Sequence, residues 1–298
     1  MDALAQNLTG HAPAKINLAL HITGRRLDGY HLIESFVVFT RFGDRLTVAP
    51  ADEDNLVVSG RYAATVPIDD ANLVLKARDA LRRATGPENA PPVAISLEKN
   101  LPVASGVGGG SSDAAATLRG LARLWTIGDV DLAVLGLPLG ADVPMCLAAT
   151  PLVARGTGGE LTPVADFPAL GLVLVNPGVP VATADVFAAL EKRDNAPLPP
   201  LPRRIDFHSL RNWLESTRND LEPAARRIEP TIGAAIKALE KAGAGFARMS
   251  GSGATCFGLF ETGNVAKRAA VSLRERHPDW FVAATRSMAS EADPHGQD

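Results

Sequence analysis

Residues 101–114 read LPVASGVGGGSSDA, and this glycine-rich stretch decides how the rest of the chain is interpreted. An apolar alternation at 93–97 precedes it and predicts a strand, and an Ala- and Leu-rich pattern at 113–125 follows it and predicts a helix. Glycines between 106 and 110 let a ligand approach backbone N–H groups, and residues 111–113 (Ser-Ser-Asp) supply N-cap chemistry. Free N–H groups at a helix N-terminus bind phosphate. The sequence therefore predicts a phosphate-binding loop; the alternative is a flexible loop with an ordinary helix cap.

The loop does not belong to the common phosphate-binding motifs. No Gly-Lys-Ser or Gly-Lys-Thr follows the glycines, so it is not a Walker A loop. Ser111 stands where the third glycine of a dinucleotide-binding Gly-x-Gly-x-x-Gly would fall if that motif began at Gly106. A less common phosphate-binding fold is needed.

The composition excludes several classes of protein. A length of 298 residues allows one large domain or two. The formal net charge of −3 gives no electrostatic support for a nucleic-acid or acidic-membrane partner. No apolar run reaches transmembrane length, and residues 1–11 lack the pattern of a secretory signal. Cys146 and Cys256 stand in apolar surroundings, as small buried residues of a reducing compartment do. We expect a cytoplasmic protein.

The pattern of elements favours an α+β fold. Residues 16–23 alternate as a half-buried strand, and the Asp28-Gly29 turn joins them in a hairpin to an apolar run at 32–39. Further strands are expected at 45–49, 56–59, 93–97, 171–175, 255–260 and 280–284, and helices at 73–83, 113–125, 183–190, 232–239 and 265–276. The turn-rich stretch 152–163 is a candidate domain boundary, and the proline-rich 195–202 is expected to be a loop. Strands interleaved with helices and hairpins argue against a fully parallel sheet.

Two charged residues are candidates for chemistry. Lys15 and Asn17 share a parity, so their side chains leave one face of a strand and can converge on one ligand; the alternative for Lys15 is a surface lysine at a strand end. Asp142 precedes Val143-Pro144, which fits an ordinary helix N-cap. It could instead accept a proton from a substrate hydroxyl, and a nearby lysine would keep the carboxylate ionised.

Two further features could contact a nucleotide. Residues 249–255 read MSGSGAT, either a tight connection or a second backbone surface close to a phosphate. Tyr30 and His31 follow the Asp-Gly turn, where they could stack on a nucleobase and bind its edge, or lie as half-buried strand residues.

Taken together, these motifs resemble the GHMP small-molecule kinase superfamily. Pro13 to Asn17, the loop 101–113 and 249–254 resemble its three signature motifs. Four more stretches resemble the branch whose substrate carries cytidine diphosphate, namely PAKINL (13–18), GRRLDGYH (24–31), LGADVP (139–144) and NPGV (176–179). The resemblance extends from about residue 13 to 260.

The resemblance implies transfer of the γ-phosphoryl group of ATP to the tertiary 2-hydroxyl of a cytidine-diphosphate-linked methylerythritol, with Mg²⁺ expected and no metal ligands assigned. Asp142 matches the catalytic base, and Lys15 matches the lysine that contacts this aspartate and the reacting hydroxyl. The matching ATP-binding positions are Asn72, Leu73, Lys99, Pro102, Ser105, Gly106, Gly108, Gly109, Gly110, Ser111 and Ser112. The matching substrate-binding positions, besides Asp142, are Asn17, Tyr30, His31, Phe187, Gly251 and Ser252, with Tyr30 and Phe187 around the cytosine.

The implied fold has two lobes. An ATP-binding lobe would span residues 1–160, a ferredoxin-like lobe 161–289 and a disordered tail 290–298, with the active site in the cleft between the lobes. Partners would be small molecules, without nucleic acid or membrane, and the chain a monomer or weak homodimer. Three alternatives remain: a sister kinase of homoserine, mevalonate or a sugar; a non-catalytic nucleotide-binding protein; and a nucleic-acid-binding protein, which the acidic balance disfavours.

Overall fold

The computed structural model describes residues 7–290, so the expected tail lies, apart from Ser290, outside the described residues. The chain divides into two compact units that are not continuous in sequence. The first contains the described part of 1–14 together with 43–103 and 108–148, and the second contains 15–42, 104–107 and the described part of 149–298. The boundary expected at residue 160 is therefore not the division that the contacts give, because residues 15–42 belong with the C-terminal half.

Two long strands contribute to both units. They are β1 (Leu8–Arg25) and β2 (His31–Pro50), each with a run of buried residues at its centre. In the first unit, the end of β2 pairs antiparallel with β4 (Val93–Glu98), and β3 (Asn55–Ser59) pairs parallel with β4. The register places Leu46 opposite Leu97 and Val48 opposite Ile95. These apolar pairs give the sheet one buried face.

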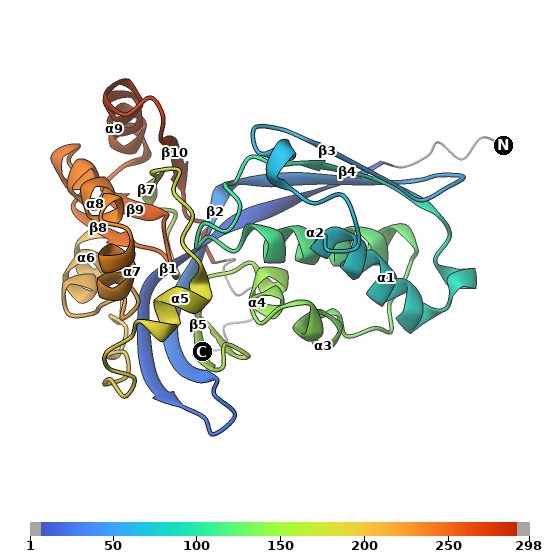
Figure 1. Ribbon diagram of the computed structural model, residues 1–298, viewed down its shortest axis with the longest axis horizontal. Coiled ribbons are helices and arrows are strands. Elements are labelled where there is room, and N and C mark those ends of the chain that lie inside the picture. Colours follow the sequence, from blue (N-terminus) through green and yellow to red (C-terminus); the bar gives the residue numbers. More distant parts are fainter. Residues whose placement is uncertain (1–6, 291–298) are drawn as a thin grey trace. The chain divides into compact units, whose positions relative to one another are not determined.

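Helices cover that face of the first unit (Figure 1). They are α1 (Leu73–Thr85), α2 (Gly109–Leu124), α3 (Leu132–Gly136) and α4 (Val143–Ala148). Short 3₁₀ helices, none with a buried residue, occur at Ala63–Thr65, Pro87–Asn89 and Leu137–Leu139. In α1, Val74, Ala77 and Leu81 are buried at helical spacing. Helix α2 packs against both α1 and α4, and its buried residues are mostly alanines and leucines.

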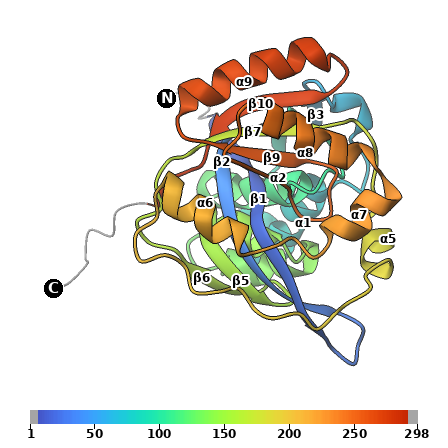
Figure 2. The same cartoon turned by 90° about the vertical axis from the view of Figure 1, so that its left-hand side faces the viewer.

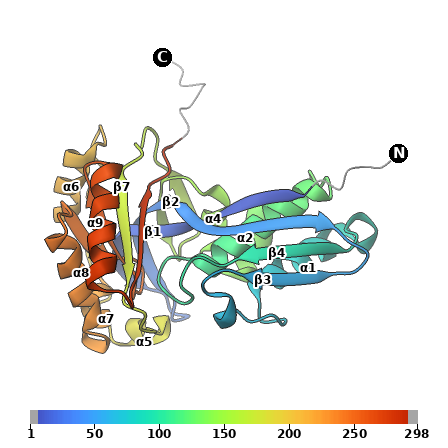
Figure 3. The ribbon, with the colours of Figure 1, turned by 90° about the horizontal axis from the view of Figure 1, so that it is seen from above.

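The second unit contains a four-stranded antiparallel sheet in the order β10-β7-β9-β8. Its strands are β7 (Gly171–Asn176), β8 (Phe246–Met249), β9 (Cys256–Phe260) and β10 (Phe281–Arg286). Helices α8 (Thr231–Lys241) and α9 (Gly263–Arg276) pack on one face of it, as Figures 2 and 3 show. The chain order of these strands and helices is β-α-β-β-α-β, the ferredoxin-like order expected from the resemblance.

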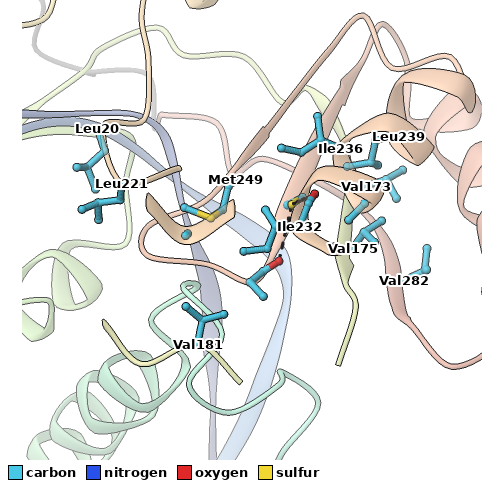
Figure 4. Packing of buried hydrophobic residues seen from close by; sticks show 14 of the residues in the cluster. Leu20, Val173, Val175, Val181, Leu221, Ile232, Ile236, Leu239, Met249 and Val282 are labelled. Atoms are coloured by element: carbon cyan, nitrogen blue, oxygen red, sulfur yellow. Dashed lines mark hydrogen bonds between the residues drawn. The ribbon is translucent and has the colours of Figure 1, made fainter. Parts of the chain in front are cut away.

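The remaining elements of the second unit surround this sheet and the first half of β2. They are β5 (Leu152–Gly156), β6 (Glu160–Pro163), α5 (Thr183–Ala188), α6 (Phe207–Glu215) and α7 (Glu222–Ile228). The buried apolar cluster is drawn in Figure 4, with Val173 and Val175 of β7 beside Ile232, Ile236 and Leu239 of α8. This packing fixes the strands whose ends carry the candidate substrate residues.

Three expectations about elements are wrong. Helix α2 begins at Gly109 rather than at 113, because its first turn is built from the glycines of the loop itself. The stretch 152–163 is the β5–β6 hairpin rather than a turn-rich boundary, and the two strands expected at 32–39 and 45–49 are the single strand β2. Residues that favour helices are scarce in the glycine-rich first turn of α2, so its helical pattern is hidden in the sequence. Turn-forming residues interrupt the β5–β6 hairpin and β2, where strand pairing overrides the local preference of the sequence.

The two cysteines are free and buried, as the sequence predicted. Among residues 7–290, no helix is long and apolar enough to cross a bilayer.

Candidate active site

The first turn of α2 has an unusual N-terminus. Gly108 occupies the N-cap in the left-handed region, with φ 65°, and as a glycine it has no side chain to accept a hydrogen bond from the first-turn N–H groups. The prediction that Ser112 and Asp113 act as N-caps is wrong. The Ser112 hydroxyl donates to the carbonyl of Pro13 at 2.6 Å, and the Asp113 carboxylate binds Lys99. The N–H groups of this turn are therefore left for an anion.

Two other segments of the first unit lie beside this turn. A Cβ on Gly110 would be 3.3 Å from the Leu73 side chain at the start of α1. The neighbouring Asn72 caps α1, since its Oδ1 accepts from Val74 N at 2.8 Å. On the other side, a Cβ on Gly140 would be 3.7 Å from Ser111 Oγ. The turn that carries Asp142 thus lies next to the glycine loop.

Asp142 begins α4. Its carbonyl accepts the first helical hydrogen bond, from Cys146 N at 3.0 Å, and Val143 and Pro144 behind it are buried. The N-cap position inferred from the sequence is therefore confirmed, and this position places a partly exposed carboxylate beside the loop. A cap position and a proton-accepting role are compatible, because the carboxylate has several lone pairs.

Lys99, an expected ATP-binding residue, is almost fully buried in the first unit. Its ammonium group donates to Asp44 and to Asp113, the second contact being 2.6 Å long. Both carboxylates are buried as well. The side chain is thus engaged by protein groups, and the main chain is engaged as well, since Lys99 N donates to the carbonyl of Ser59 at 2.7 Å and its carbonyl accepts from Tyr62 N at 3.1 Å. A direct contact of Lys99 with ATP stays a prediction.

The loop residues of the second unit are held by the 249–255 segment. Ser250 Oγ donates to the carbonyl of Gly106 at 3.0 Å, and Thr255 N donates to the carbonyl of Ser105 at 3.1 Å. Gly106 has φ 77°, and a Cβ there would lie 2.5 Å from the carbonyl oxygen of Ser250. Only glycine fits at this close approach. The two small-residue motifs of the sequence are therefore in direct contact.

Gly251 and Asn219 also support the contact between the glycine loop and the 249–255 segment. Gly251 has φ 56°, and a Cβ there would be 2.9 Å from the carbonyl oxygen of Gly106. The amide of Asn219 donates to the carbonyls of Met249 and Gly251, at 2.9 and 2.8 Å. Ser252 and Thr183 share a hydrogen bond of 2.8 Å between their hydroxyls. Asn219 lies far away in sequence and in no recognisable motif, so sequence reasoning missed it.

Asn17 and Lys15 lie in β1 beside the same segment. The backbone N–H of Asn17 donates to Ser250 Oγ, its amide group donates to Ser35 Oγ at 2.8 Å, and its buried Oδ1 has no hydrogen-bond partner among the described residues. Lys15 is buried, and its backbone N–H donates to the carbonyl of Val107 at 2.8 Å. The alternative of a surface lysine is wrong. Lys15 belongs to the second unit and Asp142 to the first, and their pairing stays a prediction.

The aromatic residues expected around the cytosine are brought together in part. The rings of His31 and Phe187 lie 4.9 Å apart, inclined by 32°, while Tyr30 at the hairpin end is exposed. His31 Nε2 is buried without a hydrogen-bond partner in the described part of the chain. Burial, with a smaller contribution from Arg25 and Arg193, lowers the pKa of His31. The ring is therefore neutral near pH 7 and can meet the edge of a base.

Comparison with known proteins identifies the family. The family models described as "GHMP kinases N terminal domain" and "GHMP kinases C terminal" match residues 72–150 and 198–279. A protein of Mesorhizobium japonicum named 4-diphosphocytidyl-2-C-methyl-D-erythritol kinase is 73% identical over 98% of this chain and 100% of that protein. The chain belongs to the 4-diphosphocytidyl-2-C-methyl-D-erythritol kinase family. A Brucella melitensis protein of that name is 53% identical over 96% of this chain and 97% of its own.

Solved structures agree with this family. The crystal structure of a 4-(cytidine 5'-diphospho)-2C-methyl-D-erythritol kinase matches with a TM-score of 0.79 and 34% identity, over 95% of this chain and 100% of that chain. A homoserine kinase from Cytophaga hutchinsonii matches with a TM-score of 0.69 but only 16% identity, over 98% of each chain, so it shows the fold alone. The GHMP kinase fold expected from the resemblance is confirmed.

Proposed function

We propose that this chain transfers the γ-phosphoryl group of ATP to the 2-hydroxyl of 4-diphosphocytidyl-2-C-methyl-D-erythritol, giving the 2-phosphate and ADP. This step belongs to the non-mevalonate synthesis of isoprenoid precursors. The observation that carries the proposal is the 73% identity to a protein named for this activity, over nearly the whole chain. The geometry of each unit agrees with the demands of phosphoryl transfer, which needs positioning and charge neutralisation more than covalent chemistry from the protein.

The donor phosphates would bind to the first turn of α2. Its N-cap residue Gly108 has no side chain to cap the first-turn N–H groups, and the close contact between Gly106 and Ser250 fixes the loop that leads into it. Mg²⁺ would accompany ATP and neutralise charge on the transferred phosphoryl group. The described residues contain no group of three or more metal-ligating side chains. Mg²⁺ bound with ATP needs none, because it takes phosphate oxygens, water and one or two carboxylates.

The proton of the acceptor hydroxyl would go to Asp142 as the oxygen forms its bond to the γ-phosphorus and the bond to ADP breaks. Asp142 is suited to this role because its carboxylate is partly exposed beside the phosphate loop. Lys15 would hold that carboxylate ionised and lower the pKa of the hydroxyl. A positioned base of this kind contributes about 10²–10⁴-fold to the rate.

The cytosine would lie against the His31–Phe187 pair, with the exposed Tyr30 ring on its other side. The buried, unpartnered Nε2 of His31 offers a hydrogen bond to the base, and the unpartnered Oδ1 of Asn17 offers an acceptor to a substrate hydroxyl. Gly251 and Ser252 would approach the same substrate through the backbone of their loop. We expect the chain to act in the cytoplasm, as a monomer or weak homodimer.

A phosphotransfer assay tests the proposal directly. The purified chain is incubated with Mg-ATP and, in turn, diphosphocytidyl-methylerythritol, homoserine, mevalonate and galactose, and both ADP and phosphorylated product are measured. Turnover with the cytidyl substrate alone supports the proposal. Turnover with another acceptor would replace the substrate assignment, and ATP binding without turnover on any acceptor would favour a non-catalytic role.

A further inference from the structure

Three charged side chains form a closed cluster inside the first unit. Lys99, just after β4, donates to Asp44 of β2 and to Asp113 of α2, and all three are buried. None is exposed enough for a surface role. Two carboxylates share one ammonium, so the cluster carries one net negative charge when all three groups are ionised. A buried charge of this kind is costly unless it is fully hydrogen-bonded.

The two carboxylates differ in how well they are satisfied. Asp44 Oδ1 accepts from the backbone N–H groups of Asn100 and Leu101, at 2.5 and 2.7 Å, and Oδ2 binds Lys99. Asp113 Oδ2 binds Lys99, but its buried Oδ1 has no partner among the described residues. Hydrogen bonds to the charged form favour ionisation. Asp44 is therefore the better satisfied carboxylate, and Asp113 is the member of the pair that accepts a proton.

The electrostatics of the cluster agree with this assignment. Burial is the largest cause that raises the pKa of Asp113, to about 7; the charge of Lys99 opposes it and that of Asp44 reinforces it. Lys99 and Asp44 are the charged groups that face Asp113. Protonation of Asp113 would leave Lys99 and Asp44 as a neutral pair.

The cluster is in contact with the phosphate loop. A Cβ on Gly109, the first residue of α2, would lie 3.1 Å from Lys99 Nζ and 3.7 Å from Asp44 Oδ2. Asp113 is on the same helix one turn later, where side chains at i and i+4 share a face. Asp44 also fixes the main chain of 100–101, which leads into the loop. The first turn of α2 thus lies directly over the cluster.

We propose that Asp44 and Lys99 are positioning residues for the donor-phosphate loop, and that Asp113 takes up a proton when the donor binds. The inference rests on the proposed function, which puts ATP phosphates on the first turn of α2. Phosphate brings negative charge to that turn and disfavours a second charge beneath it. Binding and protonation are then linked, so the affinity for Mg-ATP falls as the pH rises above neutrality.

Calorimetry with a non-hydrolysable Mg-ATP analogue tests the linkage. Titrations at pH 6.5–9, in buffers of different ionisation enthalpy, give the dissociation constant and the protons taken up. For the wild type we expect proton uptake approaching one above pH 7 and an affinity that weakens by up to about tenfold per pH unit, the limit for one linked proton. Asp113→Asn mimics the neutral acid, so its affinity should be nearly independent of pH. The nucleotide ionises in the same way in both titrations, so the difference in pH dependence between the two proteins reports the protonation of Asp113.

Asp54→Asn is the matched control. Asp54 is another carboxylate of the first unit, paired with Arg82 away from the loop, so its loss should lower stability and leave the pH dependence of binding unchanged. Lys99→Met should raise the KM for ATP more than it lowers kcat, because the donor site rather than the acceptor site is disturbed. Equal loss in both would indicate a merely structural role for Lys99.

The outcomes separate the inference from the proposed function. If the wild type does not bind the analogue, both fail. If it binds without proton uptake, or if Asp113→Asn keeps the wild-type pH dependence, only the inference is overturned. Should Asp113→Asn not fold, the infrared carbonyl band of a protonated carboxyl group, measured on the wild type with and without analogue, decides between uptake and none.

Discussion

The imidazole ring of His31 lies against the phenyl ring of Phe187, with 4.9 Å between their centroids. Residues from a hairpin near the N-terminus and from α5 are thereby joined into one aromatic surface. His31 and Phe187 are too far apart in the sequence to belong to one local motif. Under the proposed function, this pair is where the chain would distinguish a base-bearing acceptor from the small acceptors of sister kinases.

Phe187→Ala should weaken binding of the cytidyl substrate selectively. Stacking of a base on an aromatic ring is worth about 1–3 kcal/mol, so we expect its KM to rise at least about fivefold and the KM for ATP to stay unchanged. Trp280→Ala is a matched control, since Trp280 stacks on His277 and packs against the same apolar cluster as Phe187. It should lower the melting temperature and leave both KM values unchanged. A similar rise in substrate KM for both variants would contradict the cytosine assignment.

His31 should make substrate binding and stability sensitive to acid. Its folded-state pKa lies below 6.5, mainly through burial, so the neutral ring contributes stability that is fully present above pH 6.5 and declines as the pH falls below that value. The KM for the cytidyl substrate should be flat from pH 7 to 8 and rise below pH 6. His31→Gln, which cannot titrate, should remove this rise in a KM–pH profile.

Asp142→Asn should abolish most turnover without unfolding the chain. Asparagine can keep the cap position of α4 but cannot accept the proton, so kcat should fall by about 10²–10⁴-fold. The melting temperature and the affinity for Mg-ATP should stay close to wild type. Near-normal turnover would show that Asp142 is not the base.

Gly106→Ala should lower the stability of the chain by more than the strain of a positive φ alone would. Alanine at φ 77° is strained by about 1–2 kcal/mol, and its Cβ would also collide with the backbone of 250–253. Gly243→Ala isolates the first effect, because φ is 91° and a Cβ there meets nothing within 4 Å. Thermal melting should show a larger loss for Gly106→Ala, with a raised KM for ATP in that variant only. An equal loss of melting temperature in the two variants would mean that the close approach to Ser250 does not contribute.

Asp54 should contribute stability that is lost in strong acid. Its two hydrogen bonds to Arg82 are the main reason that its pKa is lowered to about 2. The contribution is fully present above pH 3.8 and disappears as the pH falls through about 2. The difference in melting temperature between wild type and Asp54→Asn should therefore be constant above about pH 5 and shrink towards pH 2.

The sequence was informative where a local pattern carries the structure. Helical spacing identified α1, α8 and α9 almost to their ends. Alternation located the first strand, but the expectation that it is half-buried is wrong, since residues 12–22 of β1 are buried on both faces. The glycine loop and the 249–255 segment were each recognised as a possible phosphate-binding surface, and the resemblance to the GHMP kinases assigned them to one site. Their contact through Ser250 and Gly106 is the structural basis of that joint pattern.

What the sequence could not give depends on distant partners. The resemblance assigned Lys99 to the ATP site, and nothing near it in sequence shows that Asp44 and Asp113 bind its ammonium. Asp113 looked like a helix cap because the true start of α2 is set by Gly108 in the left-handed region. No sequence pattern pointed to Asn219, because its amide binds the carbonyls of Met249 and Gly251, about 30 residues further along the chain. Such roles are fixed by tertiary contact rather than by local preference.

The division of β1 and β2 between the two units constrains how the chain can fold as it is made. The segments of the first unit have all been synthesised once residue 148 has emerged from the ribosome. Residues 15–42 come out early but belong with 149–298, so their unit is complete only at the end of translation. Ile33–Val37 of β2, for example, have no β5 to pair with until residues 152–156 have been made. A nascent chain therefore carries an apolar, unpaired strand edge while residues 38–151 are being made, and this is the stage at which a chaperone can bind it.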